Sequence, residues 1–106
     1  MDIQEKIDNI VKGNKVVLMM KGTKQFPQCG FSGRAVELLK AAGCEDYFVV
    51  NILQEPEIRQ GAKEYADWPT FPQLYINGEF IGGCDIVREM AASGELQPLL
   101  EAAGAL

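Results

Sequence analysis

Cys29 is the residue best placed for nucleophilic or metal-binding chemistry, because it stands between a polar loop and a predicted helix. The loop covers Lys21 to Gln28 and follows an apolar run, and the helix is predicted from about Gly30 to Ala42. Unpaired backbone N–H groups and the helix dipole lower the pKa of a thiol at such a helix N-terminus. Lys21 can add a positive charge from the end of the preceding strand. Most neighbours of Cys29 are small or polar, which favours a reactive thiol over a buried structural one.

The chain contains no histidine and three cysteines, at positions 29, 44 and 84. The lack of histidine excludes a Ser-His-Asp triad, a Cys-His nucleophile pair and every histidine-based metal site. An odd number of cysteines without a Cys-x-x-Cys pair suits neither a closed disulfide framework nor a zinc ribbon. Cys44 follows Gly43, where a predicted helix ends, and no motif surrounds it. We interpret Cys44 as structural or incidental.

Two basic residues, Arg59 and Lys63, lie four positions apart in another predicted helix, so both can face one anion. They are bases in a chain that is otherwise acidic. The alternative is that they are solvated helix charges, which is the commoner fate of Arg and Lys. For Lys63 the residues favour neither interpretation.

Two short segments that contain glycine or proline complete the set of candidate binding residues. Gly82-Gly83-Cys84-Asp85 combines close backbone approach with the start of a helix, and a helix N-terminus binds carboxylates readily. The alternative for Asp85 is an ordinary helix cap. Pro72 directly precedes a predicted strand, so local sequence fits a strand-entry proline as well as a cis proline in a tight turn.

Length and charge limit the classes of protein to which the chain can belong. Its 106 residues suffice for one hydrophobic core, so we expect a single domain over residues 1–106. Fifteen acidic against ten basic residues give a net charge of −5, which argues against nucleic-acid and anionic-membrane partners. No apolar run has the length of a membrane span. The first residues resemble neither a signal nor a transit peptide, so we expect a reducing compartment, most simply the cytoplasm; a matured organellar protein would look the same.

The apolar periodicity and the turn residues predict an α/β fold that positions these groups. Strands joined through a helix are expected to be parallel, and Asn77-Gly78 is the preferred turn of an antiparallel hairpin. We therefore expect a mixed four-stranded sheet with helices on both faces. The predicted helices begin at Ile3, Gly30, Pro56, Asp85 and Leu96, and the predicted strands cover residues 16–20, 47–52, 73–76 and 79–81.

Cys29-Gly30-Phe31-Ser32 resembles the active-site tetrapeptide of the monothiol glutaredoxins, a branch of the thioredoxin-like superfamily. The resemblance spans the chain from Ile3 to about Leu100 and is close to short single-domain members. The segments that extend it are Met20-Lys21-Gly22-Thr23, Trp68-Pro69-Thr70-Phe71-Pro72-Gln73, Asn77-Gly78-Glu79-Phe80 and Gly82-Gly83-Cys84-Asp85. The resemblance implies the thioredoxin-like fold.

The resemblance also implies a binding site for glutathione. Lys21 and Arg59 would meet the glycine carboxylate of the tripeptide. A cis Phe71-Pro72 bond would leave the Phe71 backbone facing the cleft, where an extended peptide can pair with it. Trp68-Pro69 would be a packing lid.

The same resemblance assigns the other end of the tripeptide to the start of the predicted helix after Gly83. The γ-glutamyl carboxylate would meet the backbone N–H groups of Cys84 and Asp85, and the Asp85 carboxylate would accept from the amino group.

A single thiol restricts the chemistry. Ser32 occupies the position of the second thiol of dithiol relatives, so a second glutathione must resolve a mixed disulfide of Cys29. Cys84 is the only other candidate resolver, and a disulfide between it and Cys29 is implied by the resemblance alone.

A 2Fe-2S cluster generally needs four thiolates. Two chains, each with Cys29 and one bound glutathione, would supply them, so the cluster-bound state is expected to be a homodimer. Half the ligands would then be exchangeable, which suits transfer to apo iron-sulfur proteins and agrees with the carrier role of the family. The resemblance also implies a BolA-like partner.

Two alternatives remain at this point. One is a glutathione-dependent thiol-disulfide oxidoreductase that uses Cys29 to remove glutathione from proteins; the Gly22–Gln28 loop, longer than in active dithiol relatives, favours the carrier over it. The other is an adaptor without a ligand, which does not explain why a cation, a cis-proline segment and Gly-Gly-Cys-Asp occur together.

Overall fold

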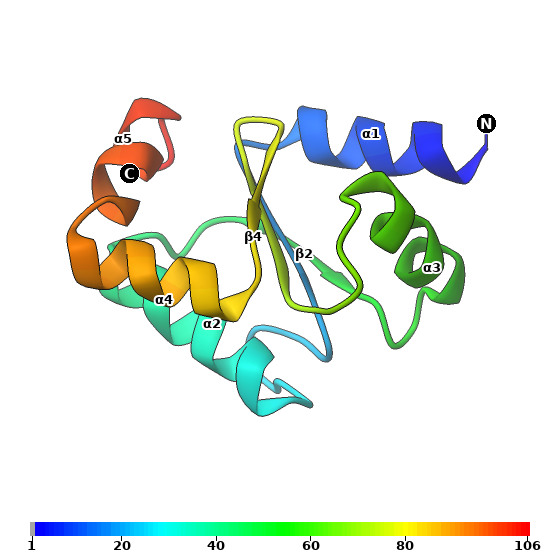
Figure 1. Cartoon of the computed structure of the whole chain (residues 1–106), viewed down its shortest axis with the longest axis horizontal. Helices are drawn as coiled ribbons and strands as arrows, with labels where there is room; N and C mark the ends of the chain where they lie inside the picture. Colours follow the sequence, from blue (N-terminus) through cyan, green and yellow to red (C-terminus); the bar gives the residue numbers. More distant parts are fainter. Residues whose placement is uncertain (1) are drawn as a thin grey trace.

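The computed structural model describes residues 2–106 and has the predicted order of helices and strands (Figure 1). Its helices are α1 (Ile3–Gly13), α2 (Gly30–Ala41), α3 (Pro56–Tyr65), α4 (Cys84–Ser93) and α5 (Leu96–Ala102), and its strands are β1 (Val16–Met20), β2 (Phe48–Asn51), β3 (Gln73–Ile76) and β4 (Glu79–Gly82). The predicted helix starts and strand bounds agree with the observed ones to within one residue. Within residues 2–106, no helix is both long and apolar enough to cross a membrane.

The strands form one mixed sheet in the order β2-β1-β3-β4. Helix α2 joins β1 to β2, which are parallel as predicted, and β3 and β4 form the predicted antiparallel hairpin. The expectation is wrong for the connection through α3, because β3 is antiparallel to β1 and therefore to β2. Met20 pairs with Asn51 at the end of β2, and Met19 pairs with Gln73 at the start of β3. The segment between them therefore returns the chain to the end of the sheet that it left, so the next strand must run the opposite way.

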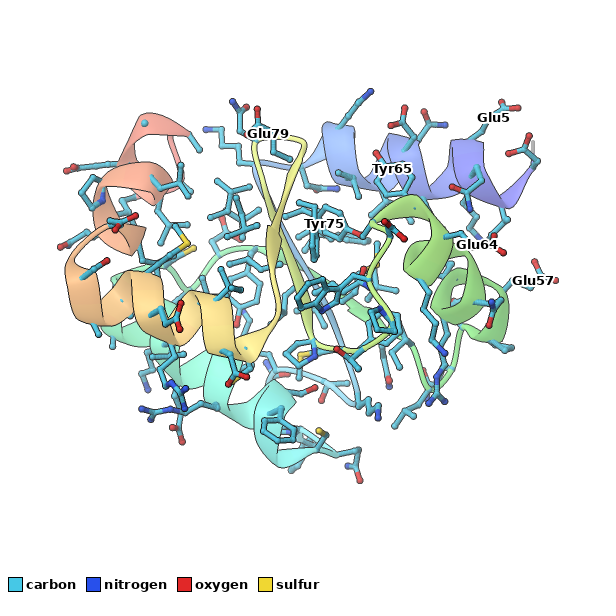
Figure 2. All side chains as sticks on the ribbon, viewed as in Figure 1. Glu5, Glu57, Glu64, Tyr65, Tyr75 and Glu79 are labelled. Carbon is cyan, nitrogen blue, oxygen red and sulfur yellow. The ribbon has the colours of Figure 1, made fainter. Side chains whose placement is uncertain are left out.

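Strand β1 is buried on both faces, as its uninterrupted apolar run predicts. Leu18 belongs to a core shared with α2, α4 and α5, whereas Val17 belongs to a second core shared with α1 and α3. Tyr75 of β3 lies in the second core, and Figure 2 shows its side chain near that of Tyr65 of α3. The end of β1 that leads into Lys21 is thus held from both faces of the sheet.

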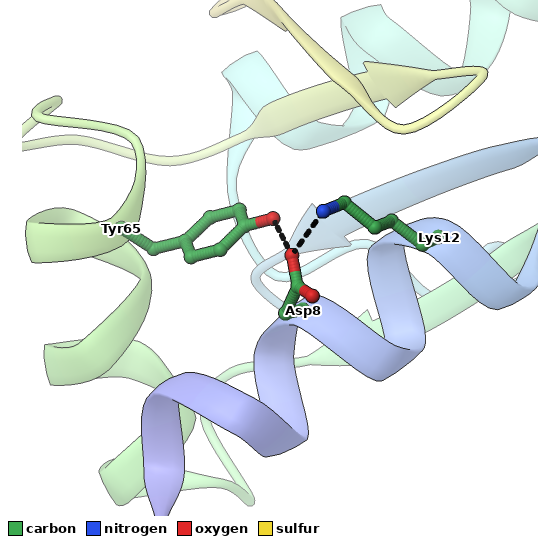
Figure 3. Close-up of polar contacts among 3 residues, drawn as sticks. All are labelled: Asp8, Lys12 and Tyr65. Carbon is green, nitrogen blue, oxygen red and sulfur yellow. Dashed lines mark hydrogen bonds and ion pairs between the residues drawn. The ribbon is translucent and has the colours of Figure 1, made fainter.

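Helices α1 and α3 pack closely and are joined by a polar contact at their surface. A Cβ atom on Gly61 would lie 2.8 Å from Ile7 Cδ1, so glycine permits this approach. The Tyr65 hydroxyl donates to Asp8 Oδ1 at 2.7 Å, and Lys12 Nζ lies 3.1 Å from the same oxygen (Figure 3). The Tyr65 hydroxyl and Lys12 lower the pKa of Asp8, while burial and Asp8 raise the pKa of Tyr65 to about 12. These contacts fix α3, which carries two of the predicted cations.

Candidate functional site

Cys29 lies immediately before α2, in an extended conformation with φ −151°, and is partly exposed. The pKa of its thiol is lowered chiefly by the backbone N–H of Ser32, against the opposing effect of burial. The Phe31 N–H, the positive charge of Lys21 and the Ser32 hydroxyl lower the pKa further. The helix N-terminus and Lys21 therefore act on the thiol in the direction that the sequence predicts.

Ser32 is fully buried, and its role was not visible in the sequence. Its Oγ accepts a hydrogen bond of 3.0 Å from the backbone N–H of Lys21, at the end of β1. The same residue presents its backbone N–H and hydroxyl to Cys29. Ser32 thus joins the strand that carries the cation to the helix that carries the thiol.

The loop between Lys21 and Cys29 is a small closed hairpin rather than an open connection. The Gln28 N–H donates to the Lys21 carbonyl at 2.8 Å, so the two ends of the loop meet. Gly22 has φ +97°, and a Cβ atom there would lie 2.6 Å from Gln28 N and from Phe26 O. Only glycine combines this backbone conformation with so close an approach.

Asn51 at the end of β2 fixes this loop from outside. Its Oδ1 accepts from the Gly22 N–H at 3.0 Å and from the Leu53 N–H at 3.1 Å. One carboxamide oxygen therefore holds both the start of the loop and the turn that follows β2.

A cavity of about 540 Å³ lies beside Cys29 and is lined by segments that are far apart in the sequence. It is built from the end of β1, the start of α2, one side of α3, residues 68–72 and the start of α4. Figure 1 shows α3 and α4 on opposite sides of the sheet, and the cavity joins them. The predicted site residues that line it are Lys21, Cys29, Arg59, Lys63, Trp68, Pro69, Phe71, Pro72, Gly83, Cys84 and Asp85.

Three further lining residues were missed: Phe31, Thr70 and Ile86. Phe31 is 63% and Ile86 is 36% exposed, so both give the cavity an apolar edge. Phe31 is a large apolar residue among small and polar neighbours in the first turn of a predicted helix, and this pattern could have identified it.

The cations at the cavity are not neutralised by acidic side chains in the part of the chain that the structure describes. Lys21, Arg59 and Lys63 face the cavity, and none of them forms an ion pair with an acidic side chain among residues 2–106. In a chain with net charge −5, three unpaired cations at one cavity form a local anion-attracting surface.

The start of α4 forms the other side of the cavity. Gly83 precedes the helix in an extended conformation, and Cys84 and Asp85 are its first two residues. The interpretation of Asp85 as an ordinary cap is wrong, because Gly83 holds the cap position and the Asp85 carboxylate lies 3.5 Å from Arg88. The backbone N–H groups of this first turn have no earlier helical carbonyl to bond, as a carboxylate site requires.

The other two cysteines differ from Cys29 in burial and pKa. Burial raises the pKa of the Cys84 thiol, and the negative charge of Asp85 raises it further. Cys44 is buried in the core with α2, and burial also raises its pKa, as a structural role predicts. In residues 2–106, no three His, Cys, Asp or Glu side chains gather into a group that could hold a metal ion.

Residues 68–72 cross the cavity and contact the start of α4. The Phe71–Pro72 bond is cis, as predicted, and the Phe71 side chain is only 7% exposed. The Trp68 indole packs on Gly83, where a Cβ atom would lie 3.3 Å from Trp68 Nε1. Its ring centroid lies 5.7 Å from that of Phe80. Trp68 is therefore packed as a wall of the cavity, and its role as a lid over a ligand stays a prediction.

Comparison with known proteins identifies the family. The glutaredoxin family model matches residues 16–81. The probable monothiol glutaredoxin 2 of Rickettsia conorii is 55% identical over 96 residues, which cover 91% of this chain and 89% of that protein. The structure of reduced apo GrxS14 from poplar is 54% identical, with a TM-score of 0.82, over 98% of this chain and 94% of that one. A buckwheat glutaredoxin–glutathione complex is 29% identical, with a TM-score of 0.86, over 98% and 92% of the two chains. The chain thus belongs to the glutaredoxin family, and within it to the monothiol branch.

Proposed function

We propose that the chain binds glutathione in the cavity beside Cys29 and, as a homodimer, carries a 2Fe-2S cluster. The four cluster ligands would be two Cys29 thiolates and two glutathione thiolates. The observation that carries the proposal is that burial and raised pKa values leave one accessible thiol of lowered pKa per chain, against the four thiolates that such a cluster needs.

The chemistry of the cavity supports glutathione as the ligand. Glutathione carries a carboxylate at each end, an amino group at one end and two peptide groups between them. Lys21 and Arg59 offer charge to one carboxylate, and the first turn of α4 offers N–H groups to the other. The volume of about 540 Å³ falls within the range of about 300–1,000 Å³ that is typical of small-molecule sites. The buckwheat relative, solved as a glutathione complex, adds support.

The arrangement of the thiol supports a cluster held between two chains. Cys29 is partly exposed at the cavity edge, beside Phe31, which is 63% exposed. A second chain that approaches this edge can add its own Cys29 and glutathione, and it can cover the exposed phenyl ring of Phe31. Because two of the four ligands are then small exchangeable molecules, the cluster is cargo that can pass to apo iron-sulfur proteins. We further propose a BolA-like partner at this site and a cytoplasmic setting, in which thiols stay reduced.

Anaerobic reconstitution tests this proposal. The protein is supplied with iron, sulfide and glutathione, and its absorption spectrum and mass are recorded. We expect a coloured dimer with one cluster per two chains, and loss of the cluster when glutathione is removed by dialysis. Cys29→Ser should bind no cluster, whereas the matched Cys44→Ser variant should bind it normally. Retention of iron and sulfide without glutathione, or in Cys29→Ser, would overturn the proposal.

The lowered pKa of Cys29 supports a second candidate function, the reduction of protein–glutathione mixed disulfides. The Cys29 thiolate would attack the glutathione sulfur, the S–S bond would break, and the protein thiolate would leave and take a proton from water. A second glutathione thiolate would then attack the Cys29–glutathione disulfide, releasing the Cys29 thiolate and glutathione disulfide. Rapid glutathione-linked turnover by a colourless monomer would favour this function over the carrier.

A further inference from the structure

Gln73, the first residue of β3, makes hydrogen bonds that the proposed function does not use. It is one of two fully buried polar side chains among residues 2–106; the other is Ser32. Its Nε2 donates to the backbone carbonyl of Trp68 at 3.2 Å and to that of Thr70 at 3.3 Å. Its Oε1 accepts from the Tyr75 hydroxyl at 2.8 Å. Both the nitrogen and the oxygen of the carboxamide are thus hydrogen-bonded within the protein.

The two carbonyls belong to the segment that crosses the cavity. Trp68 and Thr70 lie between α3 and β3, outside any helix or strand. Gln73 is fully buried, and a buried amide group without acceptors is unfavourable, so its Nε2 group favours the conformation of the segment that presents these two carbonyls. Phe71, whose backbone is predicted to pair with an extended ligand, lies directly after Thr70.

Tyr75 bonds the other end of the Gln73 carboxamide. Backbone carbonyls only accept hydrogen bonds, so Nε2 faces the carbonyls of Trp68 and Thr70. Oε1 therefore faces Tyr75, whose hydroxyl donates to it. The ring of Tyr75 is held between Tyr65, with ring centroids 6.1 Å apart, and Phe80, with centroids 5.5 Å apart.

The same tyrosine reaches the segment by a second route. Phe80 packs against Trp68 as well as against Tyr75. Polar contacts through Gln73 and aromatic contacts through Phe80 thus converge on the backbone and the side chain of Trp68. Because polar and aromatic contacts both act on this segment, we infer that they fix its conformation and do more than fill the core.

We propose that Gln73, which also bonds Tyr75, is a positioning residue that fixes the segment Trp68–Pro72 for glutathione. It touches no ligand and acts through the backbone of Trp68 and Thr70, which sets how the Phe71 peptide groups face the cavity. The inference rests on the proposed binding of glutathione.

The sharpest variant is Gln73→Glu, because the new side chain changes its donor capacity with pH. An ionised carboxylate can accept from Tyr75 but cannot donate to either carbonyl, whereas a protonated one can donate to one of them. We expect the Kd for glutathione to rise about tenfold or more relative to wild type at pH 8. At pH 5 the ratio should fall several-fold. The single tryptophan, Trp68, reports binding by fluorescence.

Two further variants keep the test decisive if Gln73→Glu does not fold. Gln73→Met retains length but bonds nothing, and should weaken glutathione binding about tenfold at every pH. Leu74→Ala is the matched control, because Leu74 is buried on the same strand but does not line the cavity. It should lower stability and leave the Kd unchanged at a temperature where the protein is fully folded. Wild-type affinity in Gln73→Met, or an equal loss of affinity in Leu74→Ala, would overturn the inference.

A readout without ligand separates this inference from the proposed function. In ligand-free protein, Gln73→Met should speed backbone hydrogen exchange in residues 68–72 more than Leu74→Ala does. If wild type fails to bind glutathione while this difference appears, the proposed function fails and the positioning role stands. If exchange in the segment is the same in both variants, the positioning role fails.

Discussion

The backbone N–H of Lys21 donates a hydrogen bond of 3.0 Å to the buried hydroxyl of Ser32. This bond ties the end of β1 to the first turn of α2. It holds a cation and a thiol on the same side of the molecule, although they lie eight positions apart in the sequence. Ser32 stands where the resemblance places the second thiol of dithiol glutaredoxins. Serine at this position forms a structural hydrogen bond but cannot resolve a mixed disulfide of Cys29.

Ser32→Ala should raise the pKa of the Cys29 thiol and destabilise the fold. The variant loses the hydroxyl that faces the sulfur, and the Lys21 N–H loses its acceptor, which costs about 1–3 kcal/mol. The pH dependence of alkylation by iodoacetamide measures the pKa, and urea unfolding measures the stability. Ser93→Ala, which removes an exposed hydroxyl on α4, should change neither. An unchanged alkylation profile in Ser32→Ala would contradict the assigned role.

Alkylation of the wild-type protein should select Cys29 from the three thiols. Its lowered pKa increases the thiolate fraction at neutral pH, whereas burial raises the pKa of Cys84 and Cys44. At pH 7 we expect one modification per native chain and three after unfolding, measured by mass spectrometry. Because a lowered pKa extends thiolate character to lower pH, the rate should begin to fall at a lower pH than it does for an ordinary thiol. Preferential labelling of Cys84 would contradict this order.

Lys21→Gln and Arg59→Gln should each weaken glutathione binding about tenfold, because each removes a charge that faces the cavity. The wild-type Kd should rise with added salt, and the variants should show a smaller rise. Trp68 fluorescence titrations measure both effects. Lys40→Gln, which changes an exposed charge near the end of α2, is the control and should bind as wild type does. A salt dependence that persists unchanged in both cavity variants would argue against a direct contact.

Gly83→Ala should displace the Trp68 indole, because the new Cβ would lie 3.3 Å from Nε1. We expect a shift of the tryptophan emission in the free protein and a loss of glutathione affinity. Gly13→Ala is the matched change, since a Cβ atom at Gly13 meets nothing within 4 Å. The prediction fails if both variants keep the wild-type emission spectrum.

The contact between α1 and α3 should make stability depend on pH at both extremes. The pKa of Tyr65 is raised to about 12, so its contribution is complete below about pH 10 and is lost as pH rises through 12. The pKa of Asp8 is lowered, so its contribution is present above the ordinary carboxyl pKa and is lost as pH falls through the lowered value. Tyr65→Phe should flatten both losses in pH series of urea unfolding. Tyr47→Phe, which removes another tyrosine of raised pKa, should flatten only the alkaline one.

Much of the fold follows from local patterns. The apolar run of β1, the helical spacing of Ile7 and Val11, and the Asn77-Gly78 turn each predict their element, because periodicity and turn conformation are properties of neighbouring residues. Asn77 and Gly78 do have positive φ values, 54° and 81°. The antiparallel entry of β3 was not predictable in this way, since it depends on where the segment after β2 returns to the sheet.

In the candidate site too, the features that depend on residue type were predictable, whereas those that depend on tertiary structure were not. The thiol, the cations and the start of α4 carry recognisable residue types, and all of them line one cavity; their contacts with glutathione remain predictions. Ser32, Asn51 and Gln73 form hydrogen bonds between their side chains and backbone groups of loops or strand ends, and these bonds depend on the tertiary structure. The sequence does not show whether a serine, an asparagine or a glutamine is bonded to solvent or to a backbone group, so these hydrogen bonds were not predicted.

The carboxamide of Asn51 receives two backbone N–H groups, one from the loop before the thiol and one from the turn after β2. β2 is an edge strand, and Asn51 does not line the cavity. A side chain on the rim of the sheet therefore helps to hold the loop that leads from the cation to the sulfur. A substitution of Asn51 is thus expected to alter the loop between Lys21 and Cys29 without removing any residue that lines the cavity.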